Sequence, residues 1–592
     1  LYYKYDCLNR LIQIEVSNGT EINYTYLDSA LEVDIKEKSS INLRYLYNNL
    51  GKLRRVIDGE GNVTEYEYDI MGNLLSISQS VDDAEIRNKD ICENNKQKKT
   101  ILIEYERDLL GRIISRTDSF GNKEKFELNR SGKITKKINS EGNSTEYVYY
   151  DDGKIAEITY SDGKCVKYEY DCNGRLIKFV DWNGENKIKR DREGRILYVE
   201  DYRGKRVAYT YNEKGQRTSI IYPDGKEVKY EYGKNFKLMQ LCFDEEQILY
   251  NYDENGRLIK KRYSNGIETE YKYGWNNKIS ELKHFDGEGT IEQYFFRYNE
   301  SGYRVEIEKK GKYLGNVGGK YQYIYDISGR LVEVVKDYKS IRKYQYDIRG
   351  NRIGKIEEGI LTSYKYNTLN QLIEIESEHQ HCQYKYDKRG NLIEIIENET
   401  ILYRFNFNML NQLTEIYDKK GKKCSYTYNA LGFRVSSWER NDEINSSEKE
   451  KNFYFDIERD SNNLLRIEGD GDSNYIWDDG IVGISSGMKS KIFLRDNLES
   501  PIYLTEKNGR ITEKYTYDEF GNTKKSEKQL FGFTGYIFED IPGMYFAQSR
   551  EYNSDLGRFM SVDYYKGNIY APVTLNEYVY CMNNPIMLVD RN

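Results

Sequence analysis

The sequence predicts an all-β fold in which a spiral of repeated β-hairpins forms a hollow shell. Three observations support this: one short motif recurs about twenty times between Leu1 and Val435, each copy places a turn between two strand-like segments, and the strands are unusually polar. A fixed period of this size indicates a repeat architecture. It outweighs the several compact domains that 592 residues would otherwise suggest.

Each copy of the motif contains a turn that begins at an index residue, which is Asp253 in the clear copy Tyr250–Leu258. Most index residues lie 20 or 21 residues apart. The residue three after the index is Gly in 14 of 20 copies and Asn in four, and both residue types tolerate positive φ. Asp or Asn at the first position of a type I turn caps local amide groups. We therefore expect a three-residue hairpin loop that a left-handed residue closes.

The strands on either side of this turn complete one hairpin per repeat. The residue before the index is aromatic in 17 of 20 copies, and the exceptions are Arg107, Leu128 and Arg190. A Tyr-x-Tyr sequence alternates with period two, so both rings lie on one face of a strand. A second turn, often Asp-Gly or Asn-Gly as at Asp162-Gly163, returns the chain to the next copy.

The polarity of the strands predicts that the shell is hollow. The chain has 59 Tyr and only 5 Pro, and 32% of its residues are charged. About forty strands at ~4.8 Å spacing would make a ribbon roughly 190 Å wide, which must curl. Wound twice, it would have a diameter of roughly 30 Å, too wide for side chains to fill. A hydrated lumen follows; the alternative is a compact solenoid with a dry core.

Three segments are expected along the chain. Residues 1–436 hold the repeats, about 20 hairpins with an insertion near 77–99, and residues 437–514 continue the β-rich shell without the strict period. Residues 515–592 form an end piece that closes the shell. Four of the five prolines occur after residue 500, where the composition changes: Pro501, Pro542, Pro572 and Pro585. Proline cannot donate to a sheet ladder, so it belongs at edges and turns.

Charge and cysteine usage exclude several classes of function. The net charge is −7 with acidic and basic residues mixed, so nucleic acid is not an expected partner. No apolar run has the length needed to cross a bilayer. The 8 cysteines are scattered without a Cys-x-x-Cys pair, so neither a disulfide framework nor a zinc signature is predicted. No signal peptide is visible, and because Leu1 begins inside a repeat we expect a fragment truncated at both ends.

The repeats resemble the YD repeats of RHS proteins, a family that includes bacterial polymorphic toxins, the C component of Tc insecticidal complexes, wall-associated bacterial proteins and the animal teneurins. The end piece resembles the RHS core-associated domain of that family. Upstream of it, Phe493–Pro501 matches a family segment that has His and Gly at the places of Asn497 and Glu499. The motifs that carry the resemblance in the end piece are Tyr515–Gly521, Phe533–Tyr536, Tyr552–Phe559 and Asn583–Ile586.

The resemblance implies a cocoon of YD-repeat hairpins that the core-associated domain closes. It further implies a secreted or cell-surface bacterial toxin shell that encapsulates and delivers its own C-terminal effector domain, which is absent from this chain, with secretion machinery as a further partner. The alternative is a cell-surface adhesion or carbohydrate-binding YD-repeat protein without cargo. In that case exposed tyrosines would bind cell-surface glycans.

The resemblance also implies an aspartyl-type self-cleavage site, at most single-turnover, made by Arg550, Asp563 and Asp590. Two carboxylates held close together can share one proton, so one can activate water while the other protonates the leaving amine. An arginine beside them can orient a carboxylate. The family usually has Pro after each Asp, whereas Tyr564 and Arg591 stand there in this sequence. The implied site needs no cofactor and no metal.

Two other interpretations of the candidate residues remain open. Asp563 and Asp590 could cap turns while Arg550 makes a surface salt bridge. A metal site at His379 and His381, which share one strand face, is a weaker alternative to an ordinary exposed strand. With only 3 His in the chain, a Ser-His-Asp hydrolase has little support.

Overall fold

The structure is a computed structural model that describes residues 1–16, 20–27, 30–36, 42–81, 98–274, 277–441, 449–459, 463–469, 471–523 and 530–590. Within these ranges nearly every ordered element is a β-strand, and the only helices are short 3₁₀ turns. Most of the insertion expected near 77–99 lies outside the described residues. The predicted all-β fold class is confirmed.

One continuous sheet contains strands β1 to β47, and each strand pairs antiparallel with the next in the chain. The first 23 strands are β1 (Tyr2–Tyr5), β2 (Leu11–Glu15), β3 (Glu21–Leu27), β4 (Ala30–Lys36), β5 (Asn42–Tyr47), β6 (Leu53–Ile57), β7 (Val63–Tyr68), β8 (Leu74–Val81), β9 (Lys98–Arg107), β10 (Ile113–Asp118), β11 (Lys123–Leu128), β12 (Ile134–Ile138), β13 (Ser144–Tyr149), β14 (Ile155–Tyr160), β15 (Cys165–Tyr170), β16 (Leu176–Asp181), β17 (Gly184–Arg190), β18 (Ile196–Glu200), β19 (Arg206–Tyr211), β20 (Arg217–Ile221), β21 (Glu227–Tyr232), β22 (Leu238–Phe243) and β23 (Glu246–Tyr252).

The remaining strands of this sheet follow in chain order, with one 3₁₀ turn, η2 (Gly315–Val317), among them. They are β24 (Leu258–Tyr263), β25 (Glu268–Tyr273), β26 (Ile279–Asp286), β27 (Gly289–Tyr298), β28 (Arg304–Gly311), β29 (Gly319–Tyr325), β30 (Leu331–Lys336), β31 (Lys339–Tyr346), β32 (Arg352–Glu357), β33 (Ile360–Tyr366), β34 (Leu372–Glu376), β35 (His381–Tyr386), β36 (Leu392–Glu397), β37 (Thr400–Phe407), β38 (Leu413–Asp418), β39 (Lys422–Tyr428), β40 (Arg434–Asn441), β41 (Lys449–Asp456), β42 (Asn463–Gly469), β43 (Ser473–Trp477), β44 (Ile481–Ser486), β45 (Lys489–Arg495), β46 (Pro501–Glu506) and β47 (Ile511–Lys514).

The turns that begin at the index residues, called index loops below, have the predicted geometry. In the loop at Asp253, the amide of Gly256 donates to the carbonyl of Asp253 (3.0 Å), and Gly256 has a φ of 75°. The Asp253 carboxylate accepts hydrogen bonds from the amides of Asn255 (3.0 Å) and Arg257 (2.9 Å). Even Phe236, which stands where most copies have Gly, adopts a φ of 64°. The loop therefore imposes the left-handed conformation on Phe236 as well.

The aromatic position before the index residue links neighbouring hairpins. The hydroxyl of Tyr149 donates to the carbonyl of Ile134 in the preceding hairpin (2.6 Å), and the same bond recurs in many copies. Where the sequence has Arg107 instead, its guanidinium donates to the equivalent carbonyl, that of Leu74 (3.1 and 3.0 Å). Arg190 does the same in its own copy. In these Tyr and Arg copies the position therefore carries a long side chain that ends in a hydrogen-bond donor.

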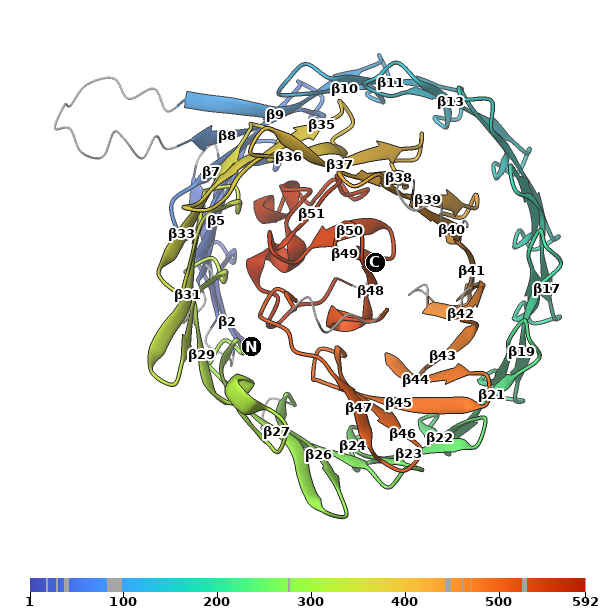
Figure 1. The fold of residues 1–592 in the computed structure, drawn as a ribbon. Helices are drawn as coiled ribbons and strands as arrows, with labels where there is room; N and C mark the ends of the chain where they lie inside the picture. The colour runs from blue at the N-terminus through green and yellow to red at the C-terminus, as the bar shows by residue number, and fades with distance from the viewer. Residues whose placement is uncertain are drawn as a thin grey trace.

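The sheet winds into a spiral whose later hairpins lie against much earlier ones (Figure 1). Ser119 bonds Thr368 (2.8 Å) across 249 residues, and Ser140 donates to the carbonyl of Lys388 (2.8 Å) across 248 residues. At 20 or 21 residues per hairpin, this offset corresponds to about 12 hairpins per turn. Two strands per hairpin at ~4.8 Å spacing give a circumference of roughly 115 Å and a diameter of roughly 37 Å.

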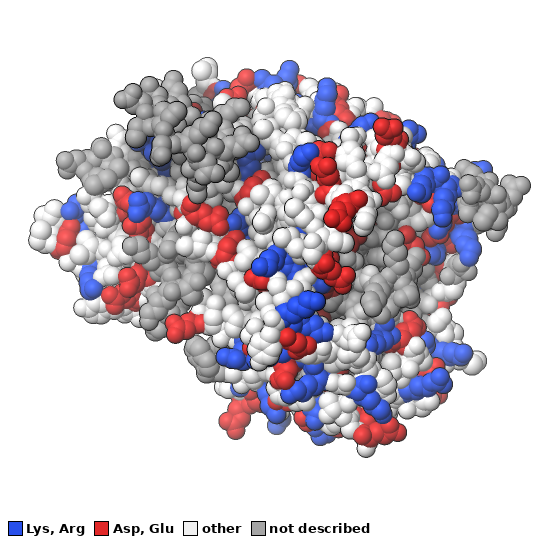
Figure 2. All heavy atoms as spheres, turned by 60° about the vertical axis from the view of Figure 1, so that its left-hand side comes forward, with Lys and Arg blue, Asp and Glu red and all other residues white. Residues whose placement is uncertain are grey.

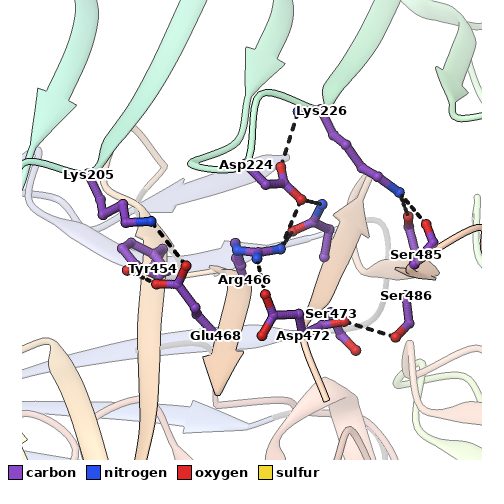
Figure 3. Close-up of polar contacts among 12 residues, drawn as sticks. Lys205, Asp224, Lys226, Tyr454, Arg466, Glu468, Asp472, Ser473, Ser485 and Ser486 are labelled. Atoms are coloured by element: carbon purple, nitrogen blue, oxygen red, sulfur yellow. Dashed lines mark hydrogen bonds and ion pairs between the residues drawn. The ribbon is translucent and has the colours of Figure 1, made fainter. Parts of the chain in front are cut away.

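The contacts between turns join an index loop of the later turn to the opposite loop of an earlier hairpin, called a return loop below. Later in the chain, where β42 and β44 lie against the earlier turn, the contacts between turns form a network of ion pairs and hydrogen bonds (Figure 3). Asp224, on a return loop, accepts from Arg466 (2.9 Å) on β42, while Lys226 donates to Ser485 (2.7 Å) on β44. Charged and polar side chains therefore connect the two turns of the spiral in this region.

The wall has two kinds of region. Residues 206–273, here the covered wall, belong to the largest apolar cluster, which residues 454–531 cover from the inner side. Residues 113–170, here the open wall, form only a small cluster around Ile158, Tyr160 and Val166. The inner face of the covered wall is therefore shielded from water, because a later stretch of the same sheet packs on it.

The outer surface is highly charged. Figure 2 shows acidic and basic side chains interspersed over the face in view. No helix in the described part of the chain has the length and apolar character that crossing a membrane requires.

Candidate active site

Residues 515–590, here the plug, leave the wall and fold inside the ring of the spiral (Figure 1). They contain a separate four-stranded antiparallel sheet and three 3₁₀ turns. These elements are β48 (Ile537–Glu539), β49 (Met544–Ala547), β50 (Arg550–Asn553), β51 (Arg558–Phe559), η3 (Phe533–Gly535), η4 (Pro572–Leu575) and η5 (Tyr580–Asn583).

Four consecutive index loops of the later turn hold the plug. In each loop the left-handed residue presents its main-chain carbonyl to a donor from the plug. The pairs are Gly329 with Asn584 (2.9 Å), Gly350 with Asn583 (2.7 Å), Asn370 with Arg558, and Gly390 with Tyr578 (2.8 Å). Four neighbouring repeats of the shell therefore offer equivalent main-chain carbonyls to the plug.

Buried ion pairs add to this attachment. Arg342 of β31 makes a two-point contact with Glu519 (2.8 Å to each oxygen), whose side chain is 3% exposed. Arg434 of β40 pairs with Glu539 and Glu551 of the plug, and all three side chains are buried. Burial, partly offset by Arg434, raises the pKa of Glu551 to about 7.

The structure brings together the three residues predicted for the site. One guanidinium nitrogen, Nη2 of Arg550, lies 2.8 Å from Oδ2 of Asp563 and 3.3 Å from Oδ2 of Asp590. Arg550 is the first residue of β50, Asp563 follows β51, and Asp590 lies beyond η5. The two carboxylates therefore converge on one cation from segments 27 residues apart in the sequence.

The arginine at the centre of this group is fixed from other directions. Its Nη1 donates to the carbonyl of Glu577 (3.1 Å), and its guanidinium carbon lies 3.6 Å from the ring centroid of Phe559. The Arg550 side chain is 9% exposed, against 35% for Asp563 and 26% for Asp590. The cation is thus buried, while both carboxylates remain partly open to water.

The alternative interpretation of these residues holds only in part. Asp563 does cap a turn, since its carboxylate accepts the amide of Tyr565 (2.8 Å). Arg550, however, is no surface salt-bridge partner, because its side chain is buried beneath two carboxylates and an aromatic ring. Capping therefore accounts for one oxygen of Asp563 and leaves the other directed at Arg550.

A cavity opens beside Asp590, between the plug and the wall. Its free space, including the mouth, is about 860 Å³. Val589 and Asp590 line one side, and aromatic residues of wall and plug line much of the rest: Phe433, Phe455, Trp477, Phe531, Tyr536 and Phe546. Asp590 therefore lies both at the carboxylate pair and at the edge of this cavity.

Sequence reasoning missed two residues that contact the group. Phe559 packs on Arg550, and the hydroxyl of Tyr536 donates to the main-chain carbonyl of Asp590. Both stand in motifs that the sequence singled out, Tyr552–Phe559 and Phe533–Tyr536, without a role for either residue. The signal was present, but a contact across 54 residues has no local trace in the sequence.

The weaker candidate at His379 and His381 receives no support as a metal site. His381 bonds the Glu374 carboxylate (2.8 Å) and is 44% exposed, while Cys382 is buried on the opposite face. Among the described residues, no group of three or more His, Cys, Asp or Glu side chains is arranged to hold a metal ion.

Two protein-family models match this sequence. The model of the teneurin YD-shell matches residues 87–276 and 258–586, and the RHS repeat model matches residues 47–82. The chain belongs to the teneurin YD-shell family. The resemblance to YD-repeat proteins is thereby confirmed over most of the chain.

Individual YD-shell relatives include bacterial and animal proteins. The tRNA nuclease WapA of Bacillus subtilis is 28% identical over 283 residues, which are 44% of this chain and 11% of that protein. Teneurin-3 of Mus musculus is 24% identical over 334 residues, 51% of this chain and 12% of that protein. This chain thus matches only about a tenth of the length of these relatives.

Solved structures share the YD-shell fold at low sequence identity. The match to the crystal structure of TcdB2-TccC3-TEV covers 100% of this chain and 34% of the chain in that structure, with a TM-score of 0.74 and 14% identity. The match to the structure of the Photorhabdus luminescens Tc holotoxin pore covers 99% of this chain and 33% of the chain in that structure, with a TM-score of 0.75 and 14% identity. At that identity the likeness shows the fold alone.

Proposed function

We propose that this chain is the shell of a bacterial RHS-type toxin, which encloses an effector domain encoded after Asn592 and delivers it to a target cell. The observation that carries the proposal is the position of the chain's C-terminal end inside the ring (Figure 1). Val589 and Asp590, the last described residues, line the cavity between plug and wall. The shell would act outside the producing cell, either secreted or at the cell surface.

The proposal includes release of the effector by a single self-cleavage. One carboxylate of the pair Asp563 and Asp590 takes a proton from water, whose oxygen attacks the carbonyl carbon of the scissile peptide. The other carboxyl gives its proton to the departing amine nitrogen as the C–N bond breaks. Arg550 holds both carboxylates in place. Water is consumed, and a new carboxyl end and a new amino end form once per chain.

The adhesion alternative has less support, because most repeat tyrosines are already engaged. Their rings lie in the apolar clusters of the shell, and their hydroxyls bond the preceding hairpin, as Tyr211 and Tyr273 do (2.8 and 2.7 Å). A tyrosine that binds glycans must instead present its ring face to solvent.

Self-cleavage is tested on the full natural chain, with whatever residues its gene encodes after Asn592. We expect two bands on a denaturing gel for the wild type and one band for Asp563→Asn or Asp590→Asn. These variants keep the shape of the side chain but remove its acid-base function. Asp555→Asn is the matched control: Asp555 is an exposed aspartate of the same plug, and this variant should cleave normally. One uncut band for the wild type would count against the proposed release.

Enclosure is tested with the same sample in its native state. If the shell surrounds the effector, an added protease should leave the effector fragment intact until the shell is unfolded. Rapid digestion of the fragment in the native protein would contradict enclosure, whether or not the chain cuts itself.

A further inference from the structure

The residue Asp590 is held at both its side chain and its main chain. Nη2 of Arg550 lies 3.3 Å from its carboxylate, and the hydroxyl of Tyr536 donates to its main-chain carbonyl. That carbonyl belongs to the peptide group that joins Asp590 to the next residue. Two-point contact fixes the direction in which the chain leaves the carboxylate pair.

The hydroxyl of Tyr536 is itself rigidly placed. Tyr536 directly follows the 3₁₀ turn η3, in which Thr534 has a φ of 51°, a strained value for a β-branched residue. Its ring is 5% exposed and packs edge-on against Tyr552 and Tyr580, with centroids 6.4 Å away in both cases. Burial raises the pKa of Tyr536 far above its usual range, so the hydroxyl keeps its proton and acts as a donor.

The contact lies where the chain meets the cavity. Tyr536, Val589 and Asp590 line the same cavity, and Trp477 of the shell lines it as well. Asp590 therefore lies between its ion pair with Arg550 and these rings. Because the Asp590 carbonyl belongs to the peptide group on the C-terminal side of this residue, the Tyr536 contact sets the orientation of that group.

We propose that Tyr536 is a positioning residue for self-cleavage, and that its hydroxyl sets which peptide bond after Asp590 meets the carboxylate pair. The inference rests on the self-cleavage proposed above. The positioning role depends on the Tyr536 hydroxyl and not on the ring, because a phenylalanine ring would fill the same space between Tyr552 and Tyr580.

The test compares Tyr536→Phe with Tyr552→Phe in the full natural chain. The two tyrosines belong to one buried ring cluster, and both donate to a main-chain carbonyl. Tyr552 donates to the carbonyl of Phe520 (2.6 Å), away from Asp590. The control thus removes a buried hydroxyl from the same packing environment and leaves the Asp590 carbonyl contact intact.

Two readouts are followed: the rate at which the uncut band disappears, and the mass of the released fragment. For Tyr536→Phe we expect about 10²-fold slower cleavage, as misplacement of reacting groups by ~1 Å typically causes, and fragments with more than one terminus. Tyr552→Phe should cleave at close to the wild-type rate and give the single wild-type terminus. A change of cut site is a result that a packing role would not produce.

The outcomes separate the inference from the function on which it rests. If the wild type cleaves and Tyr536→Phe cleaves at the same rate and bond, the positioning role is wrong and self-cleavage stands. Equal slowing of both variants with one unchanged terminus would show that only packing matters, which also overturns the inference. A wild type that never cleaves removes both.

Discussion

The open wall (residues 113–170) and the covered wall (residues 206–273) consist of the same repeat but have different energetics. In the open wall four side chains are buried: Ser115, Ile158, Tyr160 and Val166. The covered wall buries many more, including the charged Lys261, because residues 454–531 pack on its inner side. The repeat therefore determines the hairpin, and the segment that covers the hairpin determines how strongly it is held.

The largest expected difference between the two walls concerns ion pairs. Lys261 of the covered wall pairs with Asp478 (2.7 Å), and both side chains are under 5% exposed. Asp478 also accepts from Arg495 (2.8 Å), which has a second partner in Glu499, so Asp478→Asn leaves Lys261 as the buried cation that loses its counter-ion. We expect the free energy of unfolding in urea to fall by about 3–5 kcal/mol.

The matched change in the open wall is Glu146→Gln, which breaks the ion pair with Lys136 (2.8 Å). The Glu146 side chain is 54% exposed and that of Lys136 is 32% exposed. A loss of under ~1 kcal/mol is expected there. Similar losses for Glu146→Gln and Asp478→Asn would mean that the covering segment contributes little to the covered wall.

The pH range over which stability is lost should differ between the plug interface and the open wall. Burial raises the pKa of Glu551 to about 7, so its contribution to stability is full below its unfolded value near 4.5 and is lost as pH rises through 7. The loop carboxylate Asp152 has a lowered pKa, chiefly through its hydrogen bond with Lys154, so its contribution is lost only in acid.

Hydrogen exchange at pH 5 and pH 8, corrected for the intrinsic rate, measures this difference. Protection at the plug interface should weaken by on the order of 2 kcal/mol at pH 8, and protection in the open wall should stay constant. Glu551→Gln should reduce the pH dependence, and the remainder comes from Asp518, whose pKa burial raises to about 6. Equal loss of protection in both regions would contradict the assignment to Glu551.

The smallest expected effect concerns the tyrosine bond between hairpins. Tyr149→Phe removes the donor to the carbonyl of Ile134 (2.6 Å) in the open wall, and we expect a loss of about 1 kcal/mol in urea unfolding. Tyr150→Phe is the control, because that side chain also bonds a carbonyl, that of Tyr168 (2.9 Å), but is 45% exposed. No loss for Tyr149→Phe would show that the aromatic position serves packing alone.

Local structure was predictable because it depends on residues close in the sequence. Gly or Asn three residues after most index residues favours the left-handed turn, and Gly256 adopts it. Two of the three exceptions, Arg107 and Arg190, replace the tyrosine hydroxyl with another donor to the same carbonyl, whereas Leu128 has no donor. The sequence pattern showed an aromatic preference but gave no sign of the carbonyl it serves.

Contacts between turns were not predictable, because they join residues far apart with no special local pattern. Asp224 and Arg466 are ordinary charged residues 242 positions apart, and only the circumference of the spiral brings them together. For the same reason the grouping of Arg550, Asp563 and Asp590 came from a family resemblance. The structure adds their shared nitrogen and the contact of Tyr536.

Enclosure of a guest is the central claim, and a cryo-electron microscopy density map of the full natural chain tests it most directly. We predict density for the residues after Asp590 inside the ring, surrounded by the hairpin wall and separated from solvent. A map in which these residues leave the ring and fold outside it, or in which the plug fills the whole interior, would contradict the claim.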